Sequence, residues 1–177
     1  HPGRLGPSRA PALLDHVYDR PALRMTALQH LHVLYVFTHD SFYVGEDGPT
    51  HQPIEHVASL RLIPELIDLR PADATETALC LEVALKQTHK PSCIFLTRQG
   101  LPTMDPAQFP GVAEGVTKGG YVLKDCQGTP DVIVMGSGSE VSLALDAVKI
   151  LEAEAPSRKF RVVSMPSLAL YESQSQE

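Results

Sequence analysis

The sequence has no tryptophan, only three cysteines, and an aromatic content of 6% over its 177 residues. Cys80, Cys93 and Cys126 are odd in number and far apart, which argues against a disulfide framework or a zinc site. They are typical of free thiols in a reducing compartment, so we expect a cytoplasmic protein.

Long apolar runs and basic clusters are also missing. No apolar run approaches the roughly 18 residues that a membrane-spanning helix needs, and the first residues do not resemble a signal peptide. The chain carries 15 basic and 21 acidic residues without a basic block. We therefore expect neither nucleic acid nor a membrane as a partner. The chain starts with His1 and ends in a polar stretch, and we expect it to be a fragment of a longer protein.

Three common catalytic or phosphate-binding motifs do not occur: a glycine-rich loop with Gly-Lys-Ser/Thr, a Gly-x-Ser-x-Gly elbow and a His-Glu-x-x-His pair. Glu46 and Asp47 form an acidic pair, but no further ligand types stand at metal-binding spacing. We therefore expect no metal site within this chain.

Strand and helix patterns alternate along the first two-thirds of the chain. The expected order is strand 33–37, helix 54–62, strand 66–69, helix 76–86 capped by Thr75, and strand 92–97. This alternation predicts an α/β fold with a parallel sheet and helices on both faces.

Four segments are expected along the chain. Residues 1–17 have no clear period, residues 18–108 form the first α/β domain, 109–128 are a linker rich in glycine and proline, and 129–177 begin a second α/β domain. The second domain is expected to hold strand 131–135, helix 140–153 and strand 161–165. Residues 136–140 (GSGSE) join strand to helix there, and Ser139 is the more plausible helix cap than a part of an anion site.

The densest polar chemistry follows the first strand, in residues 38–53 (THDSFYVGEDGPTHQP). Ligands bind beyond the carboxyl ends of strands in such folds, so His39, Asp47 and His51 are candidates for binding the hydroxyls of a small polar substrate. The pattern is equally compatible with surface histidines and an Asp47 that caps the next helix. Arg98 ends a strand on the same side and is suited to phosphate, although an ordinary surface arginine is favoured when it is taken alone.

These residues belong to a series of motifs that resembles transketolase over residues 18–177. The motifs are THDS at 38–41, GEDGPTHQP at 45–53, EHVASLR at 55–61, RPAD at 70–73, TRQG at 97–100, GGYVL at 119–123, GSEV at 138–141 and RVVSMPS at 161–167. The resemblance implies the latter part of a pyrimidine-binding domain followed by the start of a C-terminal domain.

The resemblance also implies an activity, partners and residue roles. A thiamine-diphosphate enzyme of the pentose phosphate pathway would transfer a two-carbon ketol unit from a ketose phosphate to an aldose phosphate, and would be a homodimer. His39 and Arg98 would bind the sugar phosphate, Asp47 would accept a hydrogen bond from a substrate hydroxyl, and His51 would be catalytic by stabilising charge on the oxygen of the transferred unit.

The chain departs from the family in what it lacks. The family's catalytic glutamate and the motif that binds Mg²⁺ or Ca²⁺ lie outside this stretch, and Asp15 holds the position expected for the aromatic residue beside the cofactor. Residues 1–17 do not match the family, which suggests foreign or out-of-frame sequence. Residues 42–44 (FYV) replace a more usual Ile-Gly-Leu, which leaves the preferred sugar pair open.

Three alternatives remain. Dihydroxyacetone synthase shares most of these motifs, whereas deoxyxylulose phosphate synthase lacks the equivalent of Gln52 and Pro53. A non-catalytic pairing module that keeps the fold is the third, because the catalytic glutamate is missing. We expect the chain to be inactive alone.

Overall fold

The computed structural model describes residues 16–175, which form two compact units. Within that range, unit 1 contains residues 16–70 and 80–100, and unit 2 contains residues 71–79 and 101–175. The expectations for residues 1–15, including Asp15, lie outside the described residues. Each unit is described by itself below.

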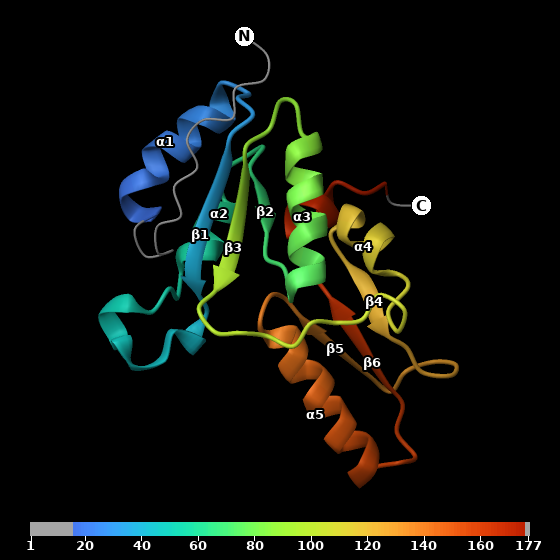
Figure 1. Cartoon of the computed structure of the whole chain (residues 1–177). Coiled ribbons are helices and arrows are strands. Elements are labelled where there is room, and N and C mark those ends of the chain that lie inside the picture. Colours follow the sequence, from blue (N-terminus) through green and yellow to red (C-terminus); the bar gives the residue numbers. More distant parts are fainter. Residues whose placement is uncertain (1–15, 176–177) are drawn as a thin grey trace. The chain divides into compact units, whose positions relative to one another are not determined.

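Unit 1 is built on a parallel sheet of three strands in the order β1-β3-β2 (Figure 1). These are β1 (Leu34–Asp40), β2 (Ile67–Leu69) and β3 (Ser92–Thr97). β3 is central and pairs with both neighbours, which places its apolar residues at the core of the unit. The prediction of a parallel sheet is confirmed.

One face of this sheet is covered by α1 (His16–Leu28) and α2 (His56–Arg61). A buried cluster joins them to the strands: Leu23, Ala27, Phe37, Leu60, Ile63, Leu66, Cys93 and Phe95. Ile94 alternates with Cys93 and Phe95 along β3, so its side chain points to the opposite face. Cys80, Val83 and Ala84 of α3 (Ala74–Lys86) are also buried in this unit.

Helix α3 begins one residue before Thr75, and its cap is a different residue. The backbone N–H of Glu76 donates to Oδ1 of Asp73 at 2.8 Å, so Asp73 is the capping side chain. The prediction of Thr75 as the cap is therefore wrong. Thr75 instead donates its hydroxyl to the carbonyl of Met104, 3.1 Å away, and so fixes a loop of unit 2.

Unit 2 contains a mixed sheet in the order β4-β6-β5. β4 (Tyr121–Lys124) runs antiparallel to β6 (Phe160–Ser164), and β5 (Val132–Gly136) runs parallel to it. Helix α5 (Glu140–Glu154) packs on one face through Val141, Ala144 and Val148, which are buried with Phe160 and Val162. The expected second strand–helix–strand unit is thus present, with an added antiparallel strand.

The segment 109–128, expected to be a linker, is ordered structure. It contains α4 (Val112–Lys118) and β4, and α4 packs beside the short helix α6 (Leu168–Glu172). Gly115 allows a close contact, because a Cβ at this position would lie 2.2 Å from the Tyr121 side chain. Gly119 ends α4 with φ +82°, a backbone angle that favours glycine. The linker prediction failed because these glycines provide close contacts and not flexibility.

The turn before α5 also differs from expectation. Ser139 stands at the start of α5 but makes no capping hydrogen bond, and its hydroxyl donates to Oε1 of the neighbouring Glu140 at 3.1 Å. The N–H of Val141 bonds to the carbonyl of Gly138 instead. Ser139 thus occupies the N-cap position, as predicted, but its side chain does not make the capping hydrogen bond.

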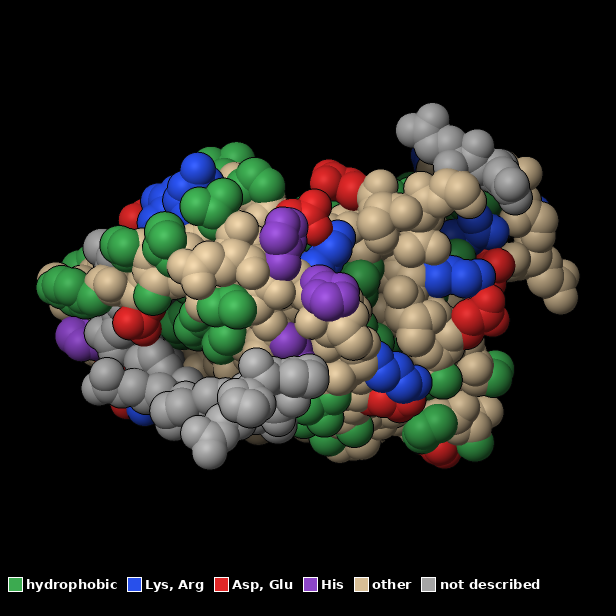
Figure 2. All heavy atoms as spheres, turned by 90° about the horizontal axis from the view of Figure 1, so that it is seen from above, with side chains coloured by type: hydrophobic (Ala, Val, Ile, Leu, Met, Phe, Trp, Pro, Cys, Tyr) green, Lys and Arg blue, Asp and Glu red, His purple; other side chains and the backbone are tan. Residues whose placement is uncertain are grey.

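Two surface properties follow from the described residues. None of the helices between residues 16 and 175 is both long and apolar enough to cross a bilayer. On the face displayed in Figure 2, lysine and arginine side chains of the described chain lie close to acidic ones, and no extended area of one sign is visible.

Candidate functional site

The candidate site lies where β1 and β3 of unit 1 end at the same edge of the sheet. Asp40 pairs with Thr97, so the loop after β1 and Arg98 after β3 leave the sheet side by side. The register shifts between Phe37 and Asp40, and β1 runs to Asp40, three residues beyond the expected end. We call this edge, with residues 39–52 and 97–99, the polar rim.

His39 lies in the irregular end of β1 and has an unusual backbone. Its φ is +60° and that of Ser41 is +71°, in the left-handed region that residues with a Cβ seldom adopt. Such a conformation costs on the order of 1 kcal/mol or more and persists because the surrounding structure enforces it. Nδ1 of His39 lies 3.0 Å from Oγ1 of Thr38, which leaves Nε2 available to a ligand.

The loop after β1 folds into two short 3₁₀ helices, η2 (Phe42–Asp47) and η3 (Pro49–His51). Ser41 starts η2 by accepting a hydrogen bond from the N–H of Tyr43 at 3.3 Å. Gly45 and Gly48 have φ of +80° and +85°, which only glycine adopts without strain. These two glycines turn the chain twice and bring Asp47 and His51 to its exposed surface.

Arg98 contacts this loop directly. Its Nη1 donates to the carbonyl oxygen of Val44 at 2.9 Å, and a Cβ on Gly45 would lie 3.9 Å from the same nitrogen. The guanidinium has five N–H donors, so this bond leaves others for a ligand. Val44 itself is buried, and therefore the loop is anchored on one side by its core contact and on the other by Arg98.

A second tie closes the loop on itself. The side-chain amide of Gln52 donates to the carbonyl of Gly45 at 3.2 Å, joining the interior of η2 to the residue after His51. The buried Oε1 of Gln52 has no hydrogen-bond partner in the described chain. In the sequence, Gln52 serves only to distinguish related families, and no pattern there predicts this hydrogen bond.

His51 repeats the arrangement of His39. Its Nδ1 lies 3.0 Å from Oγ1 of the preceding Thr50, as Nδ1 of His39 does from Thr38. In both Thr-His pairs the hydroxyl fixes the imidazole through one nitrogen and leaves Nε2 for another partner. Because His51 is exposed, that nitrogen is accessible to a solvent-borne ligand.

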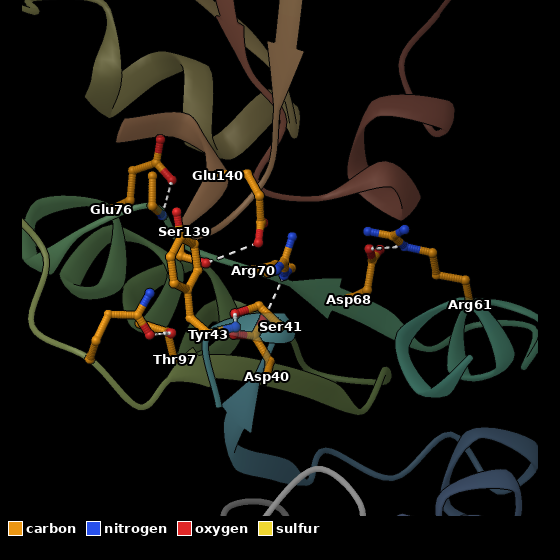
Figure 3. A network of polar contacts seen from close by, with 12 residues as sticks. Asp40, Ser41, Tyr43, Arg61, Asp68, Arg70, Glu76, Thr97, Ser139 and Glu140 are labelled. Atoms are coloured by element: carbon orange, nitrogen blue, oxygen red, sulfur yellow. Dashed lines mark hydrogen bonds and ion pairs between the residues drawn. The ribbon is translucent and has the colours of Figure 1, made fainter. Parts of the chain in front are cut away.

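A buried ion pair joins the rim to the end of β2, as Figure 3 shows. Asp40, only 1% exposed, accepts a hydrogen bond from Nε of Arg70, which follows β2. This contact holds the end of β1 next to His39. The sequence analysis did not predict this ion pair. Opposite charges at the ends of two strands of one parallel sheet could have indicated it. A second pair in Figure 3, Arg61 with the buried Asp68, fixes α2 to β2 at 2.7 Å.

Unit 2 has a buried carboxylate of its own. Glu76 accepts hydrogen bonds from the N–H of Ala72 at 2.7 Å, the hydroxyl of Tyr121 at 2.7 Å and the hydroxyl of Ser164 at 2.6 Å. Burial raises the pKa of Glu76 above its ordinary value, and the three hydrogen bonds partly offset that effect. The carboxylate joins the start of α3 to β4 and β6, which is a structural role.

The described residues hold no cluster of three or more histidine, cysteine or acidic side chains that could bind a metal ion. The polar rim contains imidazoles, a carboxylate and a guanidinium, which are groups suited to binding a polar, phosphorylated ligand.

Two family models match the chain. The transketolase pyrimidine-binding domain matches residues 13–104, and the transketolase-like C-terminal domain matches residues 119–177. Together they cover most of both units.

Individual relatives agree with these models. The transketolase of Staphylococcus aureus strain MW2 is 46% identical over 175 residues, 99% of this chain and 26% of the relative. A Pichia stipitis transketolase solved in complex with sedoheptulose-7-phosphate is 41% identical with a TM-score of 0.85, covering 96% of this chain and 24% of that one. A structure described as a split-gene transketolase, an inactive β4 tetramer, is 27% identical with a TM-score of 0.65, covering 92% and 50%.

The chain thus spans about a quarter of the length of the curated relatives it matches. The alignment with the S. aureus protein omits only about 1% of this chain and so extends into residues 1–17. The foreign origin of this segment stays a prediction, and peptide mapping of the native protein would test it. Recovery of a peptide spanning residues 5–20 would contradict it.

Proposed function

The chain belongs to the transketolase family, and on that premise we propose that its polar rim is the sugar-phosphate side of a transketolase active site. The reaction would move a two-carbon ketol unit from a ketose phosphate to an aldose phosphate. His39 and Arg98 would bind the phosphorylated sugar, and Asp47 would accept a hydrogen bond from a substrate hydroxyl. His51 would be the catalytic residue, donating to the oxygen on which charge develops.

The observation that carries this proposal is the contact between Arg98 and the loop. Arg98 comes from a different strand than His39, Asp47 and His51, yet its guanidinium lies against Val44 in the middle of their loop. An ordinary surface arginine would not be expected to form a hydrogen bond with this loop. The contact supports a common site in which the cation faces the end of a sugar whose hydroxyls meet the loop.

The geometry of the histidines supports their separate roles. Thr50 fixes Nδ1 of His51, so Nε2 is the nitrogen that would face the oxygen of the transferred unit. Thiamine diphosphate would supply the carbon that carries this unit during transfer. This chain's residues would orient the sugar and would leave the cofactor's diphosphate, with Mg²⁺ or Ca²⁺, to other parts of the enzyme.

A chimera tests these roles in a complete enzyme. Residues 16–175 would replace the aligned quarter of the S. aureus transketolase, which is 46% identical over 175 residues. The unmodified S. aureus enzyme is the reference for folding, cofactor binding and turnover. A chimera that folds and binds thiamine diphosphate, yet transfers no ketol unit, would contradict the proposal.

In the active chimera, Arg98→Ala is expected mainly to raise KM for phosphorylated sugars. Loss of one charge-assisted hydrogen bond is worth about 1.5–3 kcal/mol, or roughly 10- to 150-fold. Hydroxypyruvate, which has no phosphate, is the control substrate. An equal loss with hydroxypyruvate would assign Arg98 to the loop alone and not to phosphate.

We further propose that the 177-residue chain by itself is inactive. The described residues lack a metal cluster, and the related split-gene protein is described as inactive when it assembles as a β4 tetramer. Measurable ketol transfer by the purified chain would refute this. Dihydroxyacetone synthase remains an alternative within the same site, and the acceptor decides it: transfer to formaldehyde in preference to an aldose phosphate would favour that enzyme.

A further inference from the structure

The three residues that lead from β1 into the loop have a strained backbone on both sides of a buried carboxylate. His39 has φ +60°, Ser41 has φ +71° with ψ +167°, and Asp40 lies between them. The angles of Ser41 fall in a region that is almost exclusive to glycine. The pairing of β1 with β3 also shifts in register between Phe37 and Asp40. Irregularities of this kind change the direction of a side chain at the end of a strand.

A buried ion pair enforces the strain at residues 39–41. The carboxylate of Asp40, which is 1% exposed, accepts a hydrogen bond from Nε of Arg70 (Figure 3). Arg70 directly follows β2, and in the sheet order β1-β3-β2 the contact therefore bridges two strands that do not pair with each other. Strained angles persist only where the surrounding structure enforces them. The ion pair thus fixes the middle of the strained segment to another strand of the sheet.

His39 is held between this anchor and a contact of its own ring. The residue after it is fixed by Arg70, and its Nδ1 lies 3.0 Å from Oγ1 of Thr38. On the other side of Asp40, Oγ of Ser41 accepts a hydrogen bond from the N–H of Tyr43 at 3.3 Å. The position of the His39 backbone and the direction of its ring are therefore both constrained.

We propose that Arg70 is a positioning residue for His39: through Asp40 it holds the strained turn that presents Nε2 of His39 to the phosphate of the sugar. This inference rests on the proposed function, in which His39 binds the phosphorylated sugar. A regular strand end, or a glycine at position 41, would avoid the strain. The strain is explained by the direction that it gives to His39, because it adds nothing to the stability of the sheet.

Unit 1 contains a second ion pair of the same kind, which provides a matched control. Nε of Arg61 donates to the carboxylate of Asp68 at 2.7 Å, and Asp68 is also 1% exposed. Both arginines make their contact through Nε, where lysine has a methylene group. An exchange to lysine therefore removes the same donor from each pair and keeps the charge. Of the two pairs, only that of Arg70 includes a residue of the polar rim.

The strain itself can be tested in the 177-residue chain. Ser41→Gly and Ser41→Ala both remove the hydroxyl, but only glycine adopts the observed angles freely. We expect a higher melting temperature for Ser41→Gly than for Ser41→Ala, although glycine ordinarily lowers stability through the unfolded state. An equal or lower melting temperature for Ser41→Gly would overturn the strain on which the proposal depends.

Steady-state kinetics of the chimera test the positioning role. Arg70→Lys is expected to raise KM for sedoheptulose 7-phosphate by about three- to tenfold, because a misdirected imidazole loses part of its contact with the phosphate. Its kcat, and its kcat/KM for hydroxypyruvate, should change by less than about twofold. Arg61→Lys should change none of these values by more than about twofold. Equal effects of the two exchanges, or an equal loss with hydroxypyruvate, would overturn the proposal.

A double-mutant cycle with His39→Ala distinguishes positioning from general damage. If Arg70 acts through His39, Arg70→Lys should not raise KM any further in the His39→Ala background. Effects of the two substitutions that multiply would overturn the proposal.

The proposed function and this inference fail in different ways. If His39→Ala leaves KM for sedoheptulose 7-phosphate unchanged, His39 does not bind the phosphate, and its role in the proposed function is refuted together with the inference. If His39→Ala raises that KM but Arg70→Lys does not, the role of His39 stands and only the positioning role of Arg70 is overturned.

Discussion

The two units use polar and apolar groups in opposite ways. In unit 1 helices α1 and α2 cover one face of the sheet, and polar side chains gather at one edge, around Arg98 and the loop after β1. In unit 2 the main polar group, Glu76, is buried and accepts hydrogen bonds from groups of its own unit. This difference is the reason why the proposed chemistry is assigned to unit 1, where the polar groups are exposed, and not to unit 2.

The sharpest test of this comparison is His51→Ala in the chimera. Removing a donor aimed at developing negative charge is expected to lower kcat by about 10²- to 10³-fold, with a smaller change in KM. Steady-state kinetics measure both. A change in KM alone would remove the distinction between a catalytic His51 and a binding His39.

The next largest effect is expected from the buried ion pair beneath the rim. Arg70→Ala leaves the carboxylate of Asp40 buried without its guanidinium, which should lower the free energy of unfolding by about 3 kcal/mol. Urea denaturation of the 177-residue chain measures the change. Lys86→Ala, which removes an exposed pair with Glu82, is the control and should cost at most about 0.5 kcal/mol. Similar losses in both variants would disprove a special role for the buried pair.

Glu76 allows a pH test confined to unit 2. Its pKa is raised in the folded protein, so the folded state favours the protonated form, and its contribution to stability is lost as the pH rises through the raised pKa. Glu76→Gln, which stays neutral, should remove this dependence. We expect the unfolding free energy of the wild type, relative to that of the variant, to fall as the pH rises from about the ordinary glutamate value to neutrality. A constant difference between the two proteins would contradict the assignment.

The smallest effect concerns the Thr-His pairs. Thr50→Val removes the hydroxyl that fixes Nδ1 of His51 and should reduce kcat in the chimera by about three- to tenfold. Thr50→Ser keeps the hydroxyl and should restore most of the rate. If valine and serine gave equal rates, orientation of the imidazole by Thr50 would be excluded.

Sequence patterns predicted the parallel sheet and most helices because periodicity reports burial on one face. They failed where a residue type has more than one use. The glycine content of residues 109–128 predicts a linker, but Gly115 provides a close contact and Gly119 a helix end. Ser139 had the right type and place for a cap, yet its hydroxyl bonds to Glu140.

For the candidate site, the sequence supplied the residue types but not the contacts between them. His39, Asp47, His51 and Arg98 were chosen from motifs and from their places after strands. The ties between Gln52 and Gly45 and between Arg98 and Val44 link positions 7 and 54 residues apart, and they depend on the path of the loop. No periodic pattern encodes such a path. The functional roles of these residues stay predictions.

The bond between Arg98 and Val44 has a consequence for natural variation at this position. A planar fork can hold a backbone carbonyl with one arm and an anion with another, whereas a lysine ammonium acts as a single point charge on a flexible stem. A lysine at position 98 would therefore bind either the carbonyl of Val44 or the proposed phosphate, but not both at the same time. An exchange that conserves charge would therefore separate the observed hydrogen bond to the loop from the proposed binding of the phosphate.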